Sequence, residues 1–195
     1  AQGDVSIPQE AQRIVREVKA AFGRIDFLVC NVGSGGSVPP GQESYDEWQR
    51  VFAVNLWSAT NMVEAASGTL AETQGSIVCI SSICGNEVIS GAPVTYSAAK
   101  ASLNSYVRGI ARPLGKLGIR INAIAPGNIL FDGSVWSRKL AEDADAVKIM
   151  LERDVVLKQM GTPKNIGELV AYLVSPRASF ATGAVWTLDG GQVHS

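Results

Sequence analysis

The apolar positions of this chain follow two patterns that alternate along its length. Long stretches carry apolar residues at the i, i+3, i+4 spacing of an amphipathic helix, and short continuous apolar runs between them have the length of buried strands. We predict helices over residues 8–22, 44–71 and 95–114. We predict strands over residues 25–30, 75–80, 119–124 and 185–188.

Strands that alternate with helices indicate a parallel sheet with helices on both faces. The expected fold class is α/β, a three-layer, doubly wound, Rossmann-like sheet, in a single domain over residues 1–195. A further helix is predicted to begin at Thr162-Pro163 and to run to Leu173, because threonine is a good N-cap and proline suits the first turn. The section at about 128–160 looks irregular and apolar, and we expect it to form a lid over the substrate.

Composition and charge exclude several functional classes. The chain is 46% hydrophobic and 18% charged, with a formal net charge of −1. Scattered basic residues make nucleic acid and anionic membranes poor partners, and no apolar stretch approaches the ~20 residues that span a bilayer. Cys30, Cys79 and Cys84 match neither a metal site nor a disulfide framework, so we expect no metal and a reducing, cytoplasmic setting. The single histidine, His194, is one residue from the end, which argues against histidine catalysis.

The densest chemical signal is the pair Tyr96 and Lys100, preceded along the chain by Ser81-Ser82. Residues four apart on a helix share one face, so the phenol and the ammonium group are predicted to be neighbours. A free phenol titrates near ~10, and the nearby cation is expected to lower the Tyr96 pKa so that the phenol exchanges a proton near neutral pH. By itself this spacing more often marks a half-buried tyrosine beside a solvated lysine. The surrounding motifs therefore decide whether the pair is catalytic.

Several short motifs occur in a fixed order around this pair. They are Cys30-Asn31-Val32-Gly33, Val54-Asn55-Leu56, Ile80-Ser81-Ser82, Tyr96 to Lys100, Asn122 to Gly127, Thr182-Gly183-Ala184 and Asp189-Gly190-Gly191. In kind and in order, over residues 3–192, they resemble the motifs of the short-chain dehydrogenase/reductase family. The resemblance implies an oxidoreductase that uses NAD or NADP.

The resemblance also implies a set of catalytic residues. Tyr96 corresponds to the family's general acid/base, Lys100 to the cation that tunes it and binds the nicotinamide ribose, and Ser82 to the group that holds the substrate oxygen. Asn55 corresponds to the residue that kinks its helix and holds a water that relays protons from Lys100 to solvent. The stretch from Ser82 to Tyr96 is slightly longer than is usual in the family, so we expect the loop near Cys84 to bulge.

The implied cofactor site runs along the carboxyl ends of the strands. Residues near the N-terminus of the chain would lie at the edge of the adenine, and residues after the first predicted strand would pass under the adenosine ribose. Residues after the third predicted strand would lie against the nicotinamide. These residues are Asp4, Val5, Asn31, Val32, Gly33, Tyr96, Lys100, Pro126, Gly127 and Ile129. Phe131 stands where the family commonly has a threonine, so the nicotinamide clamp is expected to differ. We interpret the glycine-rich loop at residues 33–36 as a substrate-side loop, because it follows the wrong strand for a phosphate cradle.

Doubly wound dinucleotide-binding sheets open with a strand, a glycine-rich turn and a helix whose N-terminus holds the pyrophosphate. This chain instead begins with polar residues and enters its first helix, and Asp4-Val5 resembles the end of the family's third strand. We therefore expect the first two strands to precede residue 1 and to be missing from this chain. The choice between NAD and NADP is made at the end of the second strand, so it stays open.

Two functional hypotheses follow. The first is a dehydrogenase/reductase that acts on CH–OH groups with NAD or NADP and transfers a hydride between nicotinamide and a ketone or secondary alcohol. Its small-molecule substrate would be a 3-oxoacyl thioester or a sugar or glycan precursor. The second is a non-catalytic fragment or pseudoenzyme that serves as an assembly or binding module. The resemblance further implies a homodimer or homotetramer.

Overall fold

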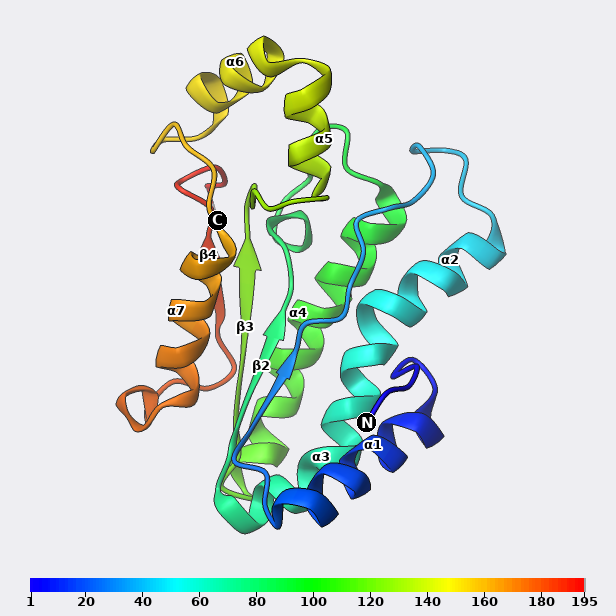
Figure 1. Cartoon of the computed structure of the whole chain (residues 1–195), viewed down its shortest axis with the longest axis vertical. Coiled ribbons are helices and arrows are strands. Elements are labelled where there is room, and N and C mark those ends of the chain that lie inside the picture. Colours follow the sequence, from blue (N-terminus) through cyan, green and yellow to red (C-terminus); the bar gives the residue numbers. More distant parts are fainter. Residues whose placement is uncertain (195) are drawn as a thin grey trace.

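Four parallel strands form the central sheet of the computed structural model, which describes residues 1–194 (Figure 1). Their order in space is β1-β2-β3-β4, and each neighbouring pair is parallel. The strands are β1 (Phe27–Cys30), β2 (Ser76–Ile80), β3 (Arg120–Pro126) and β4 (Val185–Leu188). Each agrees with a predicted strand to within two residues at either end. Strands β2 and β3 are buried on both faces, which requires the continuous apolar run seen in the sequence.

Helices join the strands and cover both faces of the sheet. In Figure 1, α7 lies on one side of the sheet, and α3 and α4 lie on the other. The helices are α1 (Pro8–Phe22), α2 (Tyr45–Phe52), α3 (Ser58–Thr73), α4 (Val94–Gly115), α5 (Val135–Glu142), α6 (Ala144–Asp154) and α7 (Pro163–Val174). Shorter elements are a π-helix at Ala53–Trp57 and 3-10 turns at Ile83–Gly85 and Pro176–Ala178.

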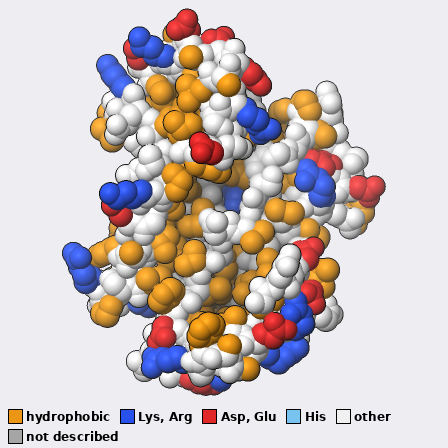
Figure 2. All heavy atoms as spheres, viewed as in Figure 1, with side chains coloured by type: hydrophobic (Ala, Val, Ile, Leu, Met, Phe, Trp, Pro, Cys, Tyr) orange, Lys and Arg blue, Asp and Glu red, His pale blue; other side chains and the backbone are white. Residues whose placement is uncertain are grey.

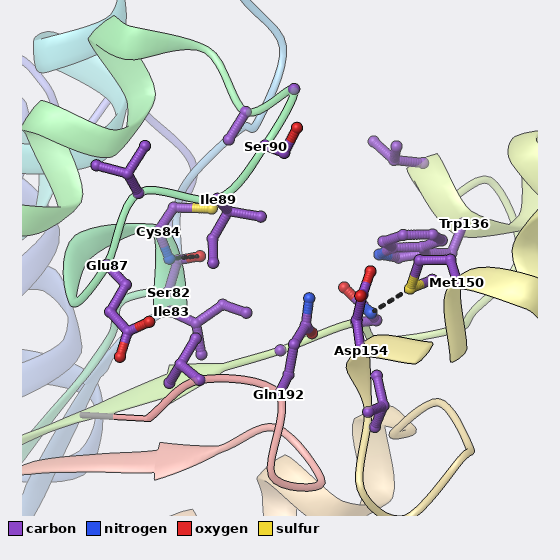
Figure 3. A pocket seen from close by; sticks show the side chains of 18 of the residues that line it. Ser82, Ile83, Cys84, Glu87, Ile89, Ser90, Trp136, Met150, Asp154 and Gln192 are labelled. Atoms are coloured by element: carbon purple, nitrogen blue, oxygen red, sulfur yellow. Dashed lines mark hydrogen bonds between the residues drawn. The ribbon is translucent and has the colours of Figure 1, made fainter. Parts of the chain in front are cut away.

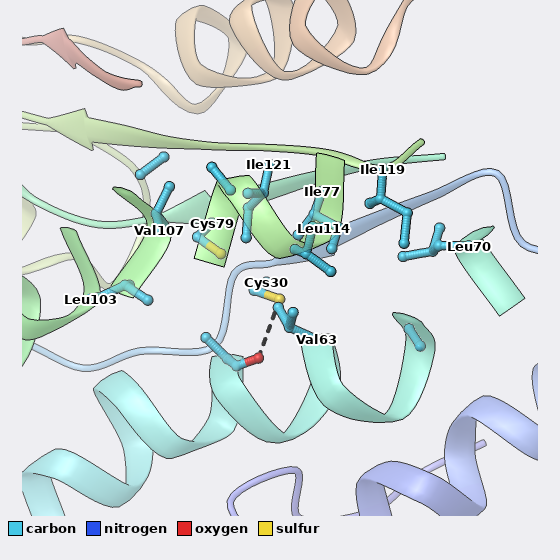
Figure 4. Close-up of a cluster of buried hydrophobic side chains, with 14 of the residues drawn as sticks. Cys30, Val63, Leu70, Ile77, Cys79, Leu103, Val107, Leu114, Ile119 and Ile121 are labelled. Atoms are coloured by element: carbon cyan, nitrogen blue, oxygen red, sulfur yellow. Dashed lines mark hydrogen bonds between the residues drawn. The ribbon is translucent and has the colours of Figure 1, made fainter. Parts of the chain in front are cut away.

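Strand β2 shows how the two hydrophobic cores arise. Successive side chains of a strand point to opposite faces of the sheet. Ile77 and Cys79 enter the cluster under α3 and α4 (Figure 4), and Val78 between them enters the cluster under α7. The expected three-layer α/β architecture is therefore confirmed.

The N-terminal residues differ from the prediction. Asp4 and Val5 were expected at the end of a strand, but Asp4 ends an irregular segment and Val5 lies in the turn before α1. The Asp4 carboxylate accepts hydrogen bonds from the Ser6 backbone N (2.9 Å) and the Ser6 Oγ (2.7 Å), and Asn61 Nδ2 donates to the Val5 carbonyl at 3.2 Å. These local bonds satisfy the backbone without a strand partner.

The section at 128–160, predicted to be irregular, contains two helices. The Ser134 side chain caps α5 by accepting from the Ser137 backbone N, and the Asp143 side chain caps α6 by accepting from the Ala146 backbone N. The base of this section is closed, because Ile129 and Gly161 form an isolated parallel bridge.

Within the described part of the chain, no helix has both the length and the apolar character needed to cross a membrane.

Candidate active site

A cleft of about 820 Å³ opens between the carboxyl ends of the strands and helices α5 and α6, both of which contribute lining residues. Figure 2 shows this face of the molecule hollowed at mid-height. In the close view of Figure 3, Ser82, Ile83 and Cys84 lie on one side of the cleft, and Trp136, Met150 and Asp154 on the other. Tyr96 and Gly127 also line it. Parallel α/β sheets commonly bind ligands at this end.

Ser82 and Tyr96 reach the cleft from two different elements. Ser82 follows the end of β2, and Tyr96 lies in the first turn of α4, which begins directly after Pro93. The 3-10 turn Ile83–Gly85 takes up the long connection between them, and the Ser82 Oγ accepts a hydrogen bond from the Cys84 backbone N at 3.2 Å. Ser81 instead points behind the site, where its Oγ donates to the Lys100 carbonyl at 3.4 Å.

Lys100 is buried one helical turn below Tyr96. Its side chain is only 3% exposed, its Nζ donates to the Ile80 carbonyl at 2.9 Å, and the Nζ lies 5.8 Å from the centroid of the Tyr96 ring. Among residues 1–194, Lys100 forms no salt bridge to a carboxylate. Burial therefore lowers its pKa to about 8, although Cys79 and Cys84 act in the opposite direction.

The buried ammonium group predicts a stability effect. In Lys100→Met we expect the Tm at pH 7 to rise by roughly 2–12 °C, because a buried, poorly paired charge costs on the order of 1–3 kcal/mol. The Lys100 pKa in the fold is about 8, below its usual 10.5. The cost is therefore complete below pH 8, and it is relieved as the pH rises toward 10.5. Thermal unfolding at pH 7 and pH 10 measures both effects.

A matched control for this substitution is Lys116→Met at the exposed end of α4, which should leave the Tm nearly unchanged. A Tm for Lys100→Met at or below that of the wild type at pH 7 would show that the ammonium group stabilises the fold.

The expected lowering of the Tyr96 pKa is not what the structure indicates. Burial raises the Tyr96 pKa, and a hydrogen bond with the Ser82 side chain only partly offsets the increase. The sequence shows the nearby cation but not the depth of burial, and burial is the larger effect here. Tyr96 is therefore a protonated phenol at neutral pH, which suits a proton donor.

Asn55 lies in the π-helix between α2 and α3, at the place where a kink was expected. Its Nδ2 donates to the carbonyls of Val51 and Ser34, both at 3.0 Å, and its Oδ1 accepts from the Ser34 backbone N at 3.0 Å. The Asn55 side chain is 1% exposed. It therefore fixes the loop after β1 against the helix.

Gly33 brings this loop close to Lys100. A Cβ at position 33 would lie 3.1 Å from both the Asn55 Oδ1 and the Lys100 Nζ. Asn31, Val32 and Gly33 are exposed beside these groups.

The residues present fit one end of a nicotinamide dinucleotide. The Lys100 ammonium has a single acceptor among residues 1–194, the Ile80 carbonyl, so it keeps N–H donors for ribose hydroxyls. Gly127 lies in the cleft wall, with Pro126 before it and Ile129 just beyond. A glycine-rich strand-turn-helix unit for the pyrophosphate does not occur within residues 1–194.

Other predicted positions lie elsewhere. Val5 and Ser6 contact the side of α3, because Asn61 Nδ2 donates to the carbonyls of both. Asp4 and Val5 do not line the cleft that holds Tyr96. No group of three or more His, Cys, Asp or Glu side chains in residues 1–194 is arranged to hold a metal ion.

Sequence reasoning missed several lining residues near the C-terminus. Gln192 and His194 line the cleft, and the His194 backbone N donates to the Glu87 Oε1 at 2.8 Å. Lys139 lies over Trp136, with its Nζ 4.6 Å from the ring centroid. The Asp189-Gly190-Gly191 motif indicates a turn near the end of the chain. The sequence does not show that the residues after this turn line the same cleft as Tyr96, because the two segments are far apart along the chain.

The chain is similar to many known proteins. A family model described as enoyl-(acyl carrier protein) reductase matches residues 1–193. Nodulation protein G of Azospirillum brasilense is 33% identical over 98% of this chain and 75% of that protein. Protein FixR of Bradyrhizobium diazoefficiens is 35% identical over 92% of this chain and 64% of that protein. An L-rhamnose 1-dehydrogenase (NAD(P)(+)) of a Sphingomonas species is 34% identical, covering 97% of this chain and 73% of that protein. The chain thus spans about two thirds to three quarters of their length.

Solved structures show the same architecture. A 7α-hydroxysteroid dehydrogenase complexed with NADH and 7-oxo glycochenodeoxycholic acid superposes with a TM-score of 0.88 at 26% identity. The match covers all of this chain and 74% of that one. ElxO with NADP bound has a TM-score of 0.90 at 24% identity, over 98% of this chain and 77% of that one.

Proposed function

Because this chain belongs to the short-chain dehydrogenase/reductase family, we propose that it is an NAD(P)-dependent oxidoreductase that interconverts a ketone and a secondary alcohol in the cleft beneath α5 and α6. The observation that carries the proposal is the convergence of Ser82 and Tyr96 on one cleft, with Lys100 buried directly below. A buried ammonium group without a carboxylate partner is costly to fold, so its retention fits a functional role.

Each of these residues has a chemical part in the proposed reduction. When bound, the nicotinamide dinucleotide supplies the hydride. The Ser82 hydroxyl orients the carbonyl oxygen of the substrate, and the Tyr96 phenol donates a proton to that oxygen. The Lys100 ammonium stabilises the phenolate that remains and binds the nicotinamide ribose. In the oxidation direction the same groups act in reverse.

The section at 128–160 is proposed to act as a lid. Among the described helices, α5 and α6 pack chiefly against each other, and they contribute Val135, Trp136 and Met150 to the cleft. Apolar side chains above Ser82 and Tyr96 would exclude water during proton and hydride transfer. Of the two substrate classes expected from the sequence, a 3-oxoacyl thioester and a sugar or glycan precursor, the sugar has a counterpart among the relatives, an L-rhamnose 1-dehydrogenase. The family model is described as an enoyl-(acyl carrier protein) reductase, a name that shares the acyl carrier but refers to a C=C bond and not to a ketone.

The first experiment combines binding and turnover on the full-length protein. NADH and NADPH are titrated while tryptophan fluorescence is followed, and turnover is assayed with a 3-oxoacyl thioester, a ring ketone and a free sugar. We expect saturable quenching by at least one nucleotide and turnover of at least one substrate. Trp136→Phe should reduce the quenching, because Trp136 lines the cleft. The absence of both quenching and turnover would overturn the proposal and favour the non-catalytic module.

A further inference from the structure

One polar atom in the wall of the cleft lacks a hydrogen-bond partner. Gln192 lines the same cleft as Ser82 and Tyr96, and its Oε1 is buried without a partner among residues 1–194. In Figure 3 its side chain extends into the space between the Ser82 side of the cleft and the Trp136 side. A buried acceptor left unpaired costs on the order of 1–3 kcal/mol. A donor on a ligand in the cleft would remove that cost.

Gln192 is held in place by its neighbours along the chain. The Asp189 carboxylate accepts from the Gly191 backbone N at 2.9 Å and from the Val193 backbone N at 2.8 Å, on either side of Gln192. The Asp189 turn packs on Gly127, where a Cβ would lie 2.7 Å from the Asp189 Cβ. The backbone on both sides of Gln192 is therefore fixed before a ligand arrives, which limits the part of the cleft that its side chain can reach.

The charges around the cleft are balanced in sign, so a ligand needs no net charge to bind there. Carboxylates and basic groups are equally represented among the described lining residues, three of each, so no single sign dominates the field. They are Glu87, Glu152, Asp154, Lys139, Arg153 and Lys158. Arg153 and Asp154 also pair with each other at 2.6 Å. A hydroxyl group is the neutral donor that an amide oxygen accepts readily.

We propose that Gln192 is a specificity-determining residue whose side-chain oxygen accepts a hydrogen bond from a substrate hydroxyl remote from the reacting carbonyl. The substrate class is then a neutral hydroxylated ketone or its polyol, in preference to a plain acyl chain. This inference rests on the proposed function, because it takes the reacting carbonyl to lie at Ser82 and Tyr96.

The test compares substrates that differ by a single hydroxyl group. Full-length wild-type protein and its variants are assayed with cyclohexanone and with 2-, 3- and 4-hydroxycyclohexanone. We expect kcat/KM for at least one hydroxyketone to exceed that for cyclohexanone by about tenfold, as one good hydrogen bond allows. Gln192→Met removes the acceptor at similar length and should bring this ratio close to one. Gln192→Glu keeps an acceptor and should retain the preference.

The test measures the ratio of kcat/KM for the hydroxyketone to kcat/KM for cyclohexanone, because a general loss of structure would lower both values together. Gln42→Met makes the same substitution at an exposed loop position outside the cleft and should leave the ratio unchanged. Turnover of all four ketones at equal kcat/KM, or a ratio that survives Gln192→Met, would overturn the role of Gln192 and leave the proposed function standing.

Absence of turnover with every ketone would instead count against the proposed function. In that case the four ketones are measured as ligands by saturation-transfer NMR. Tighter binding of a hydroxyketone that is lost in Gln192→Met supports the Gln192 proposal, and equal binding of all four overturns it.

Discussion

Tyr96→Phe is expected to lower kcat by about 10²–10⁴-fold, the usual contribution of a positioned general acid. The substitution removes only the phenol oxygen, so the ring keeps its place in the wall of the cleft beside Lys100. Nucleotide binding, followed by fluorescence, should therefore change little. The measurement is steady-state turnover with the best substrate, alongside the Tm to confirm folding.

The same helix offers a matched control for this substitution. Tyr106→Phe alters a tyrosine of α4 that packs against the core and does not line the cleft, so its kcat should stay close to that of the wild type. A Tyr96→Phe enzyme that keeps more than about a third of the wild-type kcat would show that another group donates the proton.

Gly85→Ala is expected to damage both stability and activity. A methyl group at this position would lie 2.6 Å from the Lys100 carbonyl carbon and 2.9 Å from the Ala101 backbone N. These atoms belong to the backbone of α4 and cannot rotate away, so the turn at 83–85 must move. Overpacking of this kind costs about 1–3 kcal/mol, or roughly 2–12 °C in Tm. Since the turn directly follows Ser82, a displacement of about 1 Å should lower kcat by about 10²-fold.

Gly68→Ala is the control for Gly85→Ala. Gly68 is exposed within α3, and a Cβ there would meet no atom within 4 Å. Alanine is a better helix former than glycine by about 1 kcal/mol, so this variant should be more stable than the wild type and equally active. If Gly85→Ala matched the wild type in both Tm and kcat, the turn after Ser82 would be free to shift without consequence.

The strands and long helices were predictable because their signals are local. A strand such as β2, buried on both faces, requires an unbroken apolar run, and α4 required a long amphipathic stretch. Helices α5 and α6 were missed because each is short and shows little apolar periodicity. Their cap residues Ser134 and Asp143 were visible in the sequence, but a cap without a periodic segment after it is a weak signal.

The site was predictable only where chemistry and motif coincide. Ser82, Tyr96 and Lys100 lie together as their motifs implied, but the direction of the Tyr96 pKa shift depends on burial, which the sequence does not show. Gln192 escaped notice because its contact with the cleft joins residues far apart in the chain. Asp4 and Val5 were assigned by motif alone, and in the structure Asp4 bonds with Ser6 while Val5 contacts α3.

The bridge between Ile129 and Gly161 brings together the two ends of the segment 130–160, which contains α5 and α6. The Leu130 backbone N donates to the Gly161 carbonyl, and the Gly161 backbone N donates to the Asn128 carbonyl, both at 2.9 Å. The two ends of the insert are thus pinned together next to the sheet. Lengthening such an insert costs little, about 0.6 kcal/mol for each doubling. The residues between these two ends can therefore change in length and sequence at a small cost to the stability of the sheet.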